Sequence, residues 1–278
     1  MGKRWQTALM VLSAVFLCQS TPELHYTPAA TQASAEEMVF SVQVHKSDTE
    51  HELQFEIIRP EPGHAVSLKQ ILIYHTHTYE AYQQDQQDKY VQLEQWRTKD
   101  EQHNIVAVGR ALTAALEALG FQVTHDTTAF EPPSLTDAYD RSLSMLEERG
   151  KSGEKYDLYI DLHRDALASS NSILRTVSVG DTEIARFMVL VGQGTTGGYA
   201  EKPDWLSNKA LADAITAALN DQIDGLARDV KVKTGRFNQH VANCCVLIEC
   251  GTNWNTLQEV LNGIPYLAQA ISTALGQE

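Results

Sequence analysis

The sequence predicts an α/β fold in which a mostly parallel, twisted sheet carries helices on both faces. Short apolar runs of strand length alternate along the chain with longer stretches whose apolar residues recur at helical spacing. This alternation favours a parallel sheet, because each connecting helix returns the chain to the same edge and covers one face. With 278 residues, 43% of them hydrophobic, the chain can bury one sizeable core.

Local patterns define the individual elements. A helix is predicted over Asn104–Leu119, because its apolar residues form one stripe and Gly120 stands where a helix should stop. The predicted strands of the main sheet are Gln70–Tyr74, Phe121–Thr124, Leu158–Leu162, Arg186–Val191 and Cys244–Thr252. The other predicted helices are Leu135–Glu148, Lys209–Leu226 and Thr256–Leu275, the last of them interrupted near Gly263 and Pro265.

Residues 1–35 have the features of an export segment. Lys3 and Arg4 precede a short apolar stretch, and a small-residue site, Ala33-Ser34-Ala35, follows. The apolar stretch is shorter than the roughly 17 to 25 residues of a spanning helix, which favours a cleaved signal peptide. Its distance from the small-residue site is long for cleavage, which favours an uncleaved N-terminal membrane anchor. Both alternatives therefore stay open. We expect the catalytic domain, residues 36–278, to lie outside the cytoplasm, secreted or anchored, and to begin with a β-hairpin extension over residues 36–64.

Three of the predicted strands end in histidine or acidic residues. ILIYHTHTYEAY delivers His75, His77 and Glu80, YDLYIDLHRD delivers His163, and CCVLIECGT delivers Glu249. Ligands of open α/β sheets bind beyond the carboxyl ends of the strands, so these side chains should meet at one edge. Two histidines and a carboxylate are the usual ligands of catalytic zinc, and a second carboxylate can act as general base. We therefore predict a zinc site of His77, Glu80 and His163, with Glu249 as the base.

Other residues near these motifs are alternatives. His75 stands two residues before His77, so on an extended chain it points to the same side and is either a hydrogen-bond partner of a ligand or a ligand itself. Asp100 and Glu101 lie just ahead of the first helix and are alternative sources of the carboxylate. Asp165 follows the His163 strand and is an alternative ligand or base.

Four polar residues are candidates for binding substrate. Arg164 follows His163, and Arg236, Asn238 and Gln239 belong to GRFNQH, just before a buried strand. Guanidinium and amide groups suit peptide carbonyls and carboxylates. Ordinary loop chemistry explains GRFNQH equally well.

The charge balance argues against one class of partner. The chain has 36 acidic and 22 basic residues, a formal net charge of −14, and no long basic run. Binding of duplex nucleic acid through its phosphates is therefore not expected.

The motifs ILIYHTHTYEAY, DLYIDLHRDA, GRFNQH and LIECGTNWNTLQEVL together resemble the stage II sporulation protein P family, within the wider family of zinc-dependent N-acetylmuramoyl-L-alanine amidases. The resemblance runs from about Gln70 to the C-terminus and implies a zinc amidase-like fold. It implies zinc ligands at His77 and His163 and a general base at Glu249. The glycine-rich turn that usually surrounds the first histidine is replaced by HTHTYEAY, which leaves the second ligand and the role of His75 open.

The same resemblance implies a membrane-associated peptidoglycan hydrolase that acts in forespore engulfment. It would cut the amide between N-acetylmuramic acid and L-alanine, with peptide cross-links as a further substrate. Its expected partner is stage II sporulation protein D, a glycan-cleaving enzyme. Two rival classes remain, a zinc carboxypeptidase-like peptidase and an inactive wall-binding module, and the intact Glu249 argues against the second.

Overall fold

The computed structural model describes Ser41–Lys46 and Leu53–Ile58 by their backbone, and residues 69–276 in full. The chain divides into two compact units, Met1–Ser67 and Leu68–Glu278. In the first unit, β1 (Ser41–Lys46) and β2 (Leu53–Ile58) form an antiparallel hairpin where the sequence predicts one. The export segment predicted for residues 1–35 lies outside the described residues. Within the described part, no helix has the length and apolarity needed to cross a membrane.

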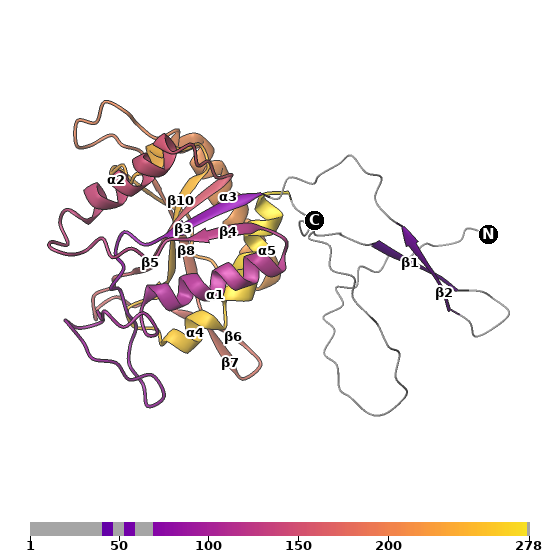
Figure 1. Ribbon diagram of the computed structural model, residues 1–278. Helices are drawn as coiled ribbons and strands as arrows, with labels where there is room; N and C mark the ends of the chain where they lie inside the picture. The colour runs from indigo at the N-terminus through magenta and orange to yellow at the C-terminus, as the bar shows by residue number, and fades with distance from the viewer. Residues whose placement is uncertain (1–40, 47–52, 59–68, 277–278) are drawn as a thin grey trace, which may run out of the picture. The chain divides into compact units, whose positions relative to one another are not determined.

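The second unit is built on a six-stranded sheet (Figure 1). Its strands in spatial order are β4 (Gln122–His125), β3 (Gln70–Tyr74), β5 (Leu158–Asp165), β10 (Cys245–Thr252), β8 (Phe187–Gly192) and β9 (Lys231–Lys233). The first four run parallel, β8 is antiparallel to β10, and β9 is parallel to β8. The predicted mostly parallel sheet is confirmed.

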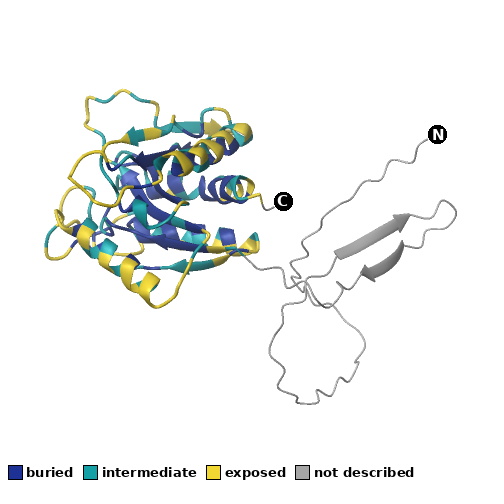
Figure 2. Cartoon of the chain, turned by 90° about the horizontal axis from the view of Figure 1, so that it is seen from above, coloured by how far each residue is buried: buried dark blue, intermediate teal, exposed yellow. Residues whose placement is uncertain are grey.

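Helices cover both faces of this sheet, as the sequence predicts. They are α1 (Ile105–Ala118), α2 (Ala138–Lys151), α3 (Trp205–Gln222), α4 (Leu257–Leu261) and α5 (Ile264–Ala274). Ile71 and Ile73 of β3 enter the large core shared with α1, α3, α4 and α5, whereas Leu72 and Tyr74 pack with Leu146 of α2 on the other face. Figure 2 shows the buried strands between helices whose outer sides are exposed.

Four short elements have no counterpart among the predicted ones, and one of them is β9 at the edge of the sheet. A hairpin of β6 (Thr176–Val179) and β7 (Thr182–Ala185) precedes β8, and a single 3-10 turn, η1 (Gln239–Val241), precedes β10. Each is too short to show a hydrophobic period, which explains why the pattern of apolar residues did not predict them.

The carboxyl ends of β3, β5 and β10 lie side by side, which places the predicted site. In the parallel register, His163 of β5 is the direct neighbour of Glu249 on β10. Leu162 and Ile248 point into the large core. Because successive residues of a strand alternate between faces, His163 and Glu249 point to the opposite face, the one that α2 covers.

Candidate active site

A turn after β3 brings the first part of the site to the end of β5. β3 ends at Tyr74, and a turn covers residues 76–79. Thr76 fixes this turn, because its N–H and its hydroxyl donate to the buried carboxylate of Asp161 over 2.8 and 2.7 Å. The N–H of Glu80 donates to the carbonyl of His77 over 3.2 Å. The three-residue spacing of His77 and Glu80 therefore sets both side chains beside β5.

His77, Glu80 and His163 form one cluster. The rings of His77 and His163 meet edge to face, with their centroids 5.2 Å apart. His163 Nδ1 lies 3.4 Å from Glu80 Oε2, and His163 Nε2 lies 2.8 Å from Asp161 Oδ1. Glu80 Oε2 also accepts a hydrogen bond from the N–H of Arg164 over 3.0 Å. The structure thus brings together the three residues predicted as zinc ligands.

The electrostatics of this cluster favour one positive charge between carboxylates. Burial opposes the protonation of His163, but Asp161 and Glu80 raise its pKa well above the ordinary value. Burial also opposes the ionisation of Glu80, but Arg164 and His163 lower its pKa to about 2. Burial and the neighbouring His163 lower the pKa of His77 to about 4. His77 therefore stays neutral, as a metal ligand must be.

Glu249 occupies the position that suits a general base. Its residue is 8% exposed, and burial raises its pKa to about 8, although His163 acts in the other direction. A carboxylate whose pKa is raised toward neutrality is a stronger base than an ordinary glutamate. In the parallel register Glu249 is the direct neighbour of His163, so the proposed base lies next to the proposed metal ligands.

Unpaired polar atoms test whether the site fits a metal. Among the described residues, the buried atoms without a hydrogen-bond partner include His77 Nδ1 and Glu249 Oε2. Such atoms are rare in folded proteins and mark a place for a ligand. In the same part of the chain, no three histidine, cysteine or acidic side chains are arranged as a complete metal site. The donor types of His77, Glu80 and His163 fit zinc, and side-chain rotation would be needed to close the site around it.

His75 does not share the side of His77 that an extended chain would give it. The strand has already ended at Tyr74, so the turn separates the two rings. His75 is fully buried, with Nδ1 3.0 Å from the carbonyl oxygen of Leu162 and Nε2 2.8 Å from Nε2 of His125. Both of its nitrogens are engaged away from the cluster, so His75 supports the neighbouring strand instead of serving as a ligand.

The alternative carboxylates lie elsewhere. The side chain of Asp100 is 48% exposed and lies 3.8 Å from His103, and Glu101 is exposed beside Arg110. Asp165 is closer to the site, where its Oδ2 accepts a 2.8 Å hydrogen bond from Arg228. Of the carboxylates predicted from the sequence as ligands, Glu80 is therefore the one that lies within 3.4 Å of a histidine nitrogen.

Arg164 has a structural role instead of the predicted contact with substrate. It is 7% exposed, and its guanidinium donates to the carbonyls of Ala81 and Trp96 over 3.0 and 3.1 Å. Buried donors must be satisfied inside the protein, and here they hold the segment that follows Glu80 against β5.

Two of the three candidate residues in GRFNQH are also bonded within the fold, and the third reaches the surface loops. Asn238 donates to the carbonyl of Tyr139 in α2 over 2.8 Å, and the amide of Gln239 exchanges hydrogen bonds of 2.8 and 2.9 Å with the backbone of β8. Both amides are therefore engaged within the fold and not directed at substrate. Arg236 lies 4.1 Å from the centroid of the Tyr199 ring and is the one member of this set whose side chain reaches the surface loops.

Two carboxylates of the site were missed by sequence reasoning. Asp161 stands two residues before His163 in YIDLHRD, and the alternation of a strand could have placed it on the same face. Glu131, buried in a loop before α2, forms an ion pair with Arg97, and its Oε1 lies 3.8 Å from His77 Nδ1. No periodic pattern surrounds Glu131, so nothing in the sequence singles it out.

Comparison with solved structures finds N-acetylmuramoyl-L-alanine amidases. The chain is similar to AmiC2 of Nostoc punctiforme, with 15% identity over 75% of this chain and 96% of that chain and a TM-score of 0.44. It is also similar to the CwlD amidase of Clostridioides difficile, solved in complex with the GerS lipoprotein, with 16% identity over 76% and 100% of the two chains and a TM-score of 0.49. No curated protein sequence matches this chain.

A family model supplies the stronger evidence. The model described as Stage II sporulation protein P matches residues 18–272, which extends well to the N-terminal side of the motifs noted in the sequence. This match confirms the family that the motifs resemble. The chain belongs to the stage II sporulation protein P family.

Proposed function

We propose that this protein is a zinc-dependent N-acetylmuramoyl-L-alanine amidase that cleaves the amide between N-acetylmuramic acid and L-alanine in peptidoglycan. The observation that carries the proposal is the convergence of His77, Glu80 and His163 with the buried Glu249 at the carboxyl ends of β3, β5 and β10. Membership of the family supplies the substrate class. Cleavage of peptide cross-links would be a second activity of the same site.

His77, Glu80 and His163 would hold the zinc ion, which would supply a Lewis acid that polarises the scissile carbonyl and lowers the pKa of water to about 7. Glu131 lies beside His77, and Asp161 lies beside His163. A carboxylate at hydrogen-bond distance fixes the orientation and tautomer of a histidine ligand, so Asp161 would orient His163. Glu131, 3.8 Å from His77 Nδ1, would add negative charge beside the metal.

Glu249 would move the proton in both halves of the reaction. Its unpaired Oε2 would accept a proton from the attacking water and later donate it to the leaving amine of L-alanine. Burial excludes bulk water from the side chain and raises its pKa, which strengthens it as a base. Gly251, two residues after Glu249 on β10, has a φ of 70°, a left-handed backbone conformation that favours glycine.

We further propose that the enzyme acts outside the cytoplasm, with stage II sporulation protein D as its partner during engulfment. The support is the export pattern of residues 1–35 together with the family match. A reporter enzyme that is active only after export, fused to the C-terminus, should be active in cells. An inactive reporter would contradict the proposed location.

Mass spectrometry of the fragments released from purified sacculi by the full-length chain tests the reaction. Release of stem peptides with a free L-alanine amine is the expected result. Loss of single C-terminal residues would identify a carboxypeptidase, and binding without release would identify a wall-binding module. The Glu249→Gln variant is the matched inactive control.

A second arm tests the metal. Elemental analysis should find about one zinc per chain, and a chelator should abolish release, which added zinc should restore. Full activity in protein shown to be free of metal would remove zinc from the proposal and leave the amidase assignment to the fragment analysis.

A further inference from the structure

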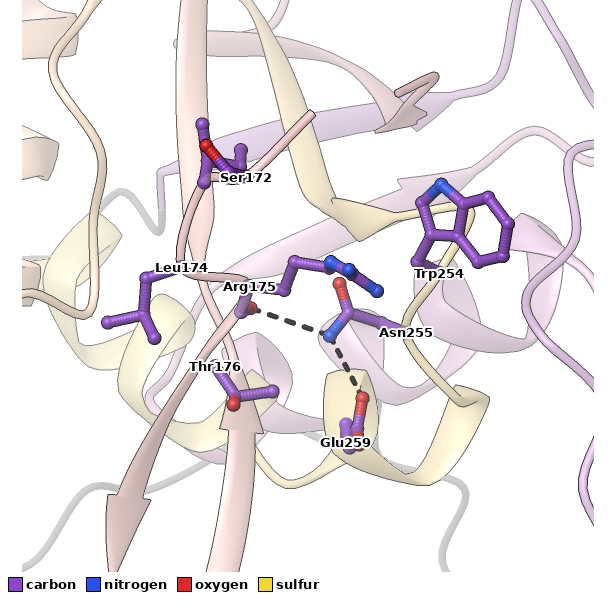
Figure 3. Close-up of a pocket in the computed structure, with 8 residues that line it drawn as sticks. Ser172, Leu174, Arg175, Thr176, Trp254, Asn255 and Glu259 are labelled. Carbon is purple, nitrogen blue, oxygen red and sulfur yellow. Dashed lines mark hydrogen bonds between the residues drawn. The ribbon is translucent and has the colours of Figure 1, made fainter. Parts of the chain in front are cut away.

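A pocket that follows the carboxyl end of β10 is lined by residues that the proposed reaction does not use (Figure 3). Its volume is about 430 Å³, within the range of small-ligand sites. The lining includes Ile173, Leu174 and Arg175, just before β6, and Trp254, Asn255 and Glu259, from the end of β10 to α4. The segment before β6 and the segment after β10 thus line the same pocket.

Arg175 presents an unpaired guanidinium to this pocket. Its carbonyl oxygen is fixed by hydrogen bonds from the N–H of Arg186 and the side chain of Asn255, over 2.9 and 3.4 Å. The guanidinium carbon lies 5.6 Å from the centroid of the Trp254 ring, and no hydrogen bond or ion pair joins the group to any described residue. An arginine stacked on an aromatic ring keeps its edge donors free for a carboxylate.

Glu259 contributes the opposite charge. Its Oε2 accepts hydrogen bonds from Asn255 Nδ2 and from the N–H of Thr256, over 2.9 and 3.1 Å, as part of the capping box that begins α4. Its Oε1 forms no hydrogen bond within the described part of the chain. Arg175 and Glu259 therefore line one pocket without pairing with each other, which suits a ligand that carries both charges.

The pocket is within reach of a peptide that is cut beside Glu249. Asn255 Oδ1 accepts hydrogen bonds from the N–H and hydroxyl of Thr252, over 2.9 and 3.0 Å, so one side chain joins the end of β10 to the pocket wall. Thr252 is three residues after Glu249, a separation of at most about 11 Å. An extended peptide of three to five residues spans roughly 10 to 18 Å, so its far end can reach Arg175.

We propose that this pocket binds a zwitterionic amino-acid end of the stem peptide, with the carboxylate on Arg175 and the ammonium on Glu259. The proposal rests on the proposed function, because it takes the ligand to be part of peptidoglycan. The chemical class is a diamino dicarboxylic acid whose side chain ends in an amine and a carboxylate on one carbon. Acylation of that amine in a cross-link removes its positive charge, so the pocket would favour peptides that are not cross-linked.

Binding of a soluble tripeptide to the full-length chain tests the two contacts separately. L-Alanyl-γ-D-glutamyl-diaminopimelate would be titrated in a calorimeter in three forms, free, amidated at the side-chain carboxylate, and acetylated at the side-chain amine. For the wild-type chain, each blocked form should bind roughly 1.5- to 5-fold more weakly than the free form, the range of solvent-accessible ion pairs.

Two variants make the test specific. Arg175→Gln should bind the free and amidated forms equally, and Glu259→Gln, which retains a side chain compatible with the capping box, should bind the free and acetylated forms equally. Arg110→Gln, in a side chain that is 57% exposed on α1, is the control and should keep the wild-type pattern. Persistence of the full carboxylate effect in Arg175→Gln would overturn the proposal.

The binding readout separates this proposal from the proposed function, because it needs no turnover. A wild-type chain that shows the charge pattern but releases nothing from sacculi would support the pocket and contradict the amidase. A chain that releases stem peptides but binds all three forms equally would support the amidase and overturn the pocket. Loss of chitooligosaccharide binding in Arg175→Gln, with peptide binding unchanged, would also overturn it, because the pocket would then hold glycan.

Discussion

Two pairs of histidines lie near the carboxyl ends of neighbouring strands, and they differ in how far their nitrogens are satisfied. His75 and His125 meet with their ring centroids 5.1 Å apart, and His77 and His163 meet at 5.2 Å. Both nitrogens of His75 have partners at hydrogen-bond distance, a carbonyl and a second histidine, whereas His77 Nδ1 has none among the residues described. The nitrogens of His163 lie 3.4 and 2.8 Å from carboxylate oxygens of Glu80 and Asp161. The second pair therefore differs from the first in its unpaired nitrogen and in its acidic neighbours.

The two pairs also differ in the charge that they accept. Burial lowers the pKa of His75 to about 3 and that of His125 to about 4, so this pair stays neutral near neutral pH. At His163, Asp161 and Glu80 outweigh burial and raise the pKa. The first pair therefore carries no positive charge near neutral pH, whereas His163 of the second pair lies where a positive charge is stabilised. Substitutions should separate the two regions by their effects on metal binding, catalysis and folding.

The largest effect is expected for His163→Ala. A two-ligand remnant binds zinc weakly, so this variant should lose both metal and turnover. Elemental analysis and release of stem peptides from sacculi measure the two losses, and circular dichroism establishes that the variant is folded. Near-normal zinc and turnover in the folded variant would show that the pair His77 and His163 is not the metal site.

Glu249→Gln should come next, and it should separate catalysis from metal binding. The substitution keeps the volume and removes the basicity, so kcat should fall by roughly 10² to 10⁴-fold, the range for a positioned acid–base group. Zinc content and binding to sacculi should stay at wild-type levels. Loss of zinc would make Glu249 a ligand, and turnover within a few-fold of wild type would place the base at Asp165 or Glu80.

Glu80→Ala and His75→Ala form the direct contrast between the two regions. Loss of the ligand Glu80 should weaken zinc binding more than loss of His75, which is not a ligand. Loss of a residue that only supports a ligand typically weakens metal binding by about 10 to 100-fold. Competition with a chromophoric chelator measures both affinities. Equal zinc affinity in Glu80→Ala and the wild type would mean that another carboxylate completes the site, and Asp161 and Glu131, which lie beside the histidines, are then the ones to substitute.

Much of the fold was predictable because its elements carry strong local signals. The predicted helix over Asn104–Leu119 corresponds to α1, whose N-cap is Asn104, and the break near Gly263 and Pro265 separates α4 from α5. The antiparallel β8 was predicted as a strand, but its direction was not. Strand direction depends on long-range pairing with β10, which the apolar pattern of one segment does not encode.

The candidate site was predictable where residues follow strands and obscure where they lie in loops. His77, Glu80, His163 and Glu249 were identified because parallel strands bring their carboxyl ends to one edge. Glu131 reaches the site from a loop, through an ion pair with Arg97 that only the folded chain forms. Arg164 was assigned to substrate because the sequence shows its charge but not the backbone carbonyls that it satisfies.

A smaller effect, on folding, should follow from Gly109→Ala beside the buried pair. A Cβ atom at Gly109 would lie 2.5 Å from His125 Nε2 and 2.7 Å from His75 Nε2. Such crowding typically costs about 1 to 3 kcal/mol of unfolding free energy. Gly150→Ala, at a helical glycine of α2 with no neighbour within 4 Å, is the control and should be neutral or stabilising. Chemical denaturation measures both, and equal stability of the two variants would contradict tight packing at His75 and His125.

The smallest effect concerns the pH dependence of stability and tests whether the buried pair stays neutral. Burial, assisted by Arg110 and opposed by Asp126, lowers the pKa of His125 from 6.5 to about 4. As the pH falls from 6.5 toward 4, the unfolded chain binds a proton that the folded chain does not, so the stability contributed by this residue is complete above pH 6.5 and is lost over this window.

His125→Gln removes that titration, so the unfolding free energy of the variant should fall less steeply between pH 6.5 and 4 than that of the wild type. The difference in slope is at most about 1.4 kcal/mol per pH unit, the value for one proton, and denaturant titrations at several pH values measure it. Equal slopes would mean that the folded chain protonates the ring of His125. The contrast between the two pairs would then rest on the unpaired Nδ1 of His77 and on the carboxylates beside His163.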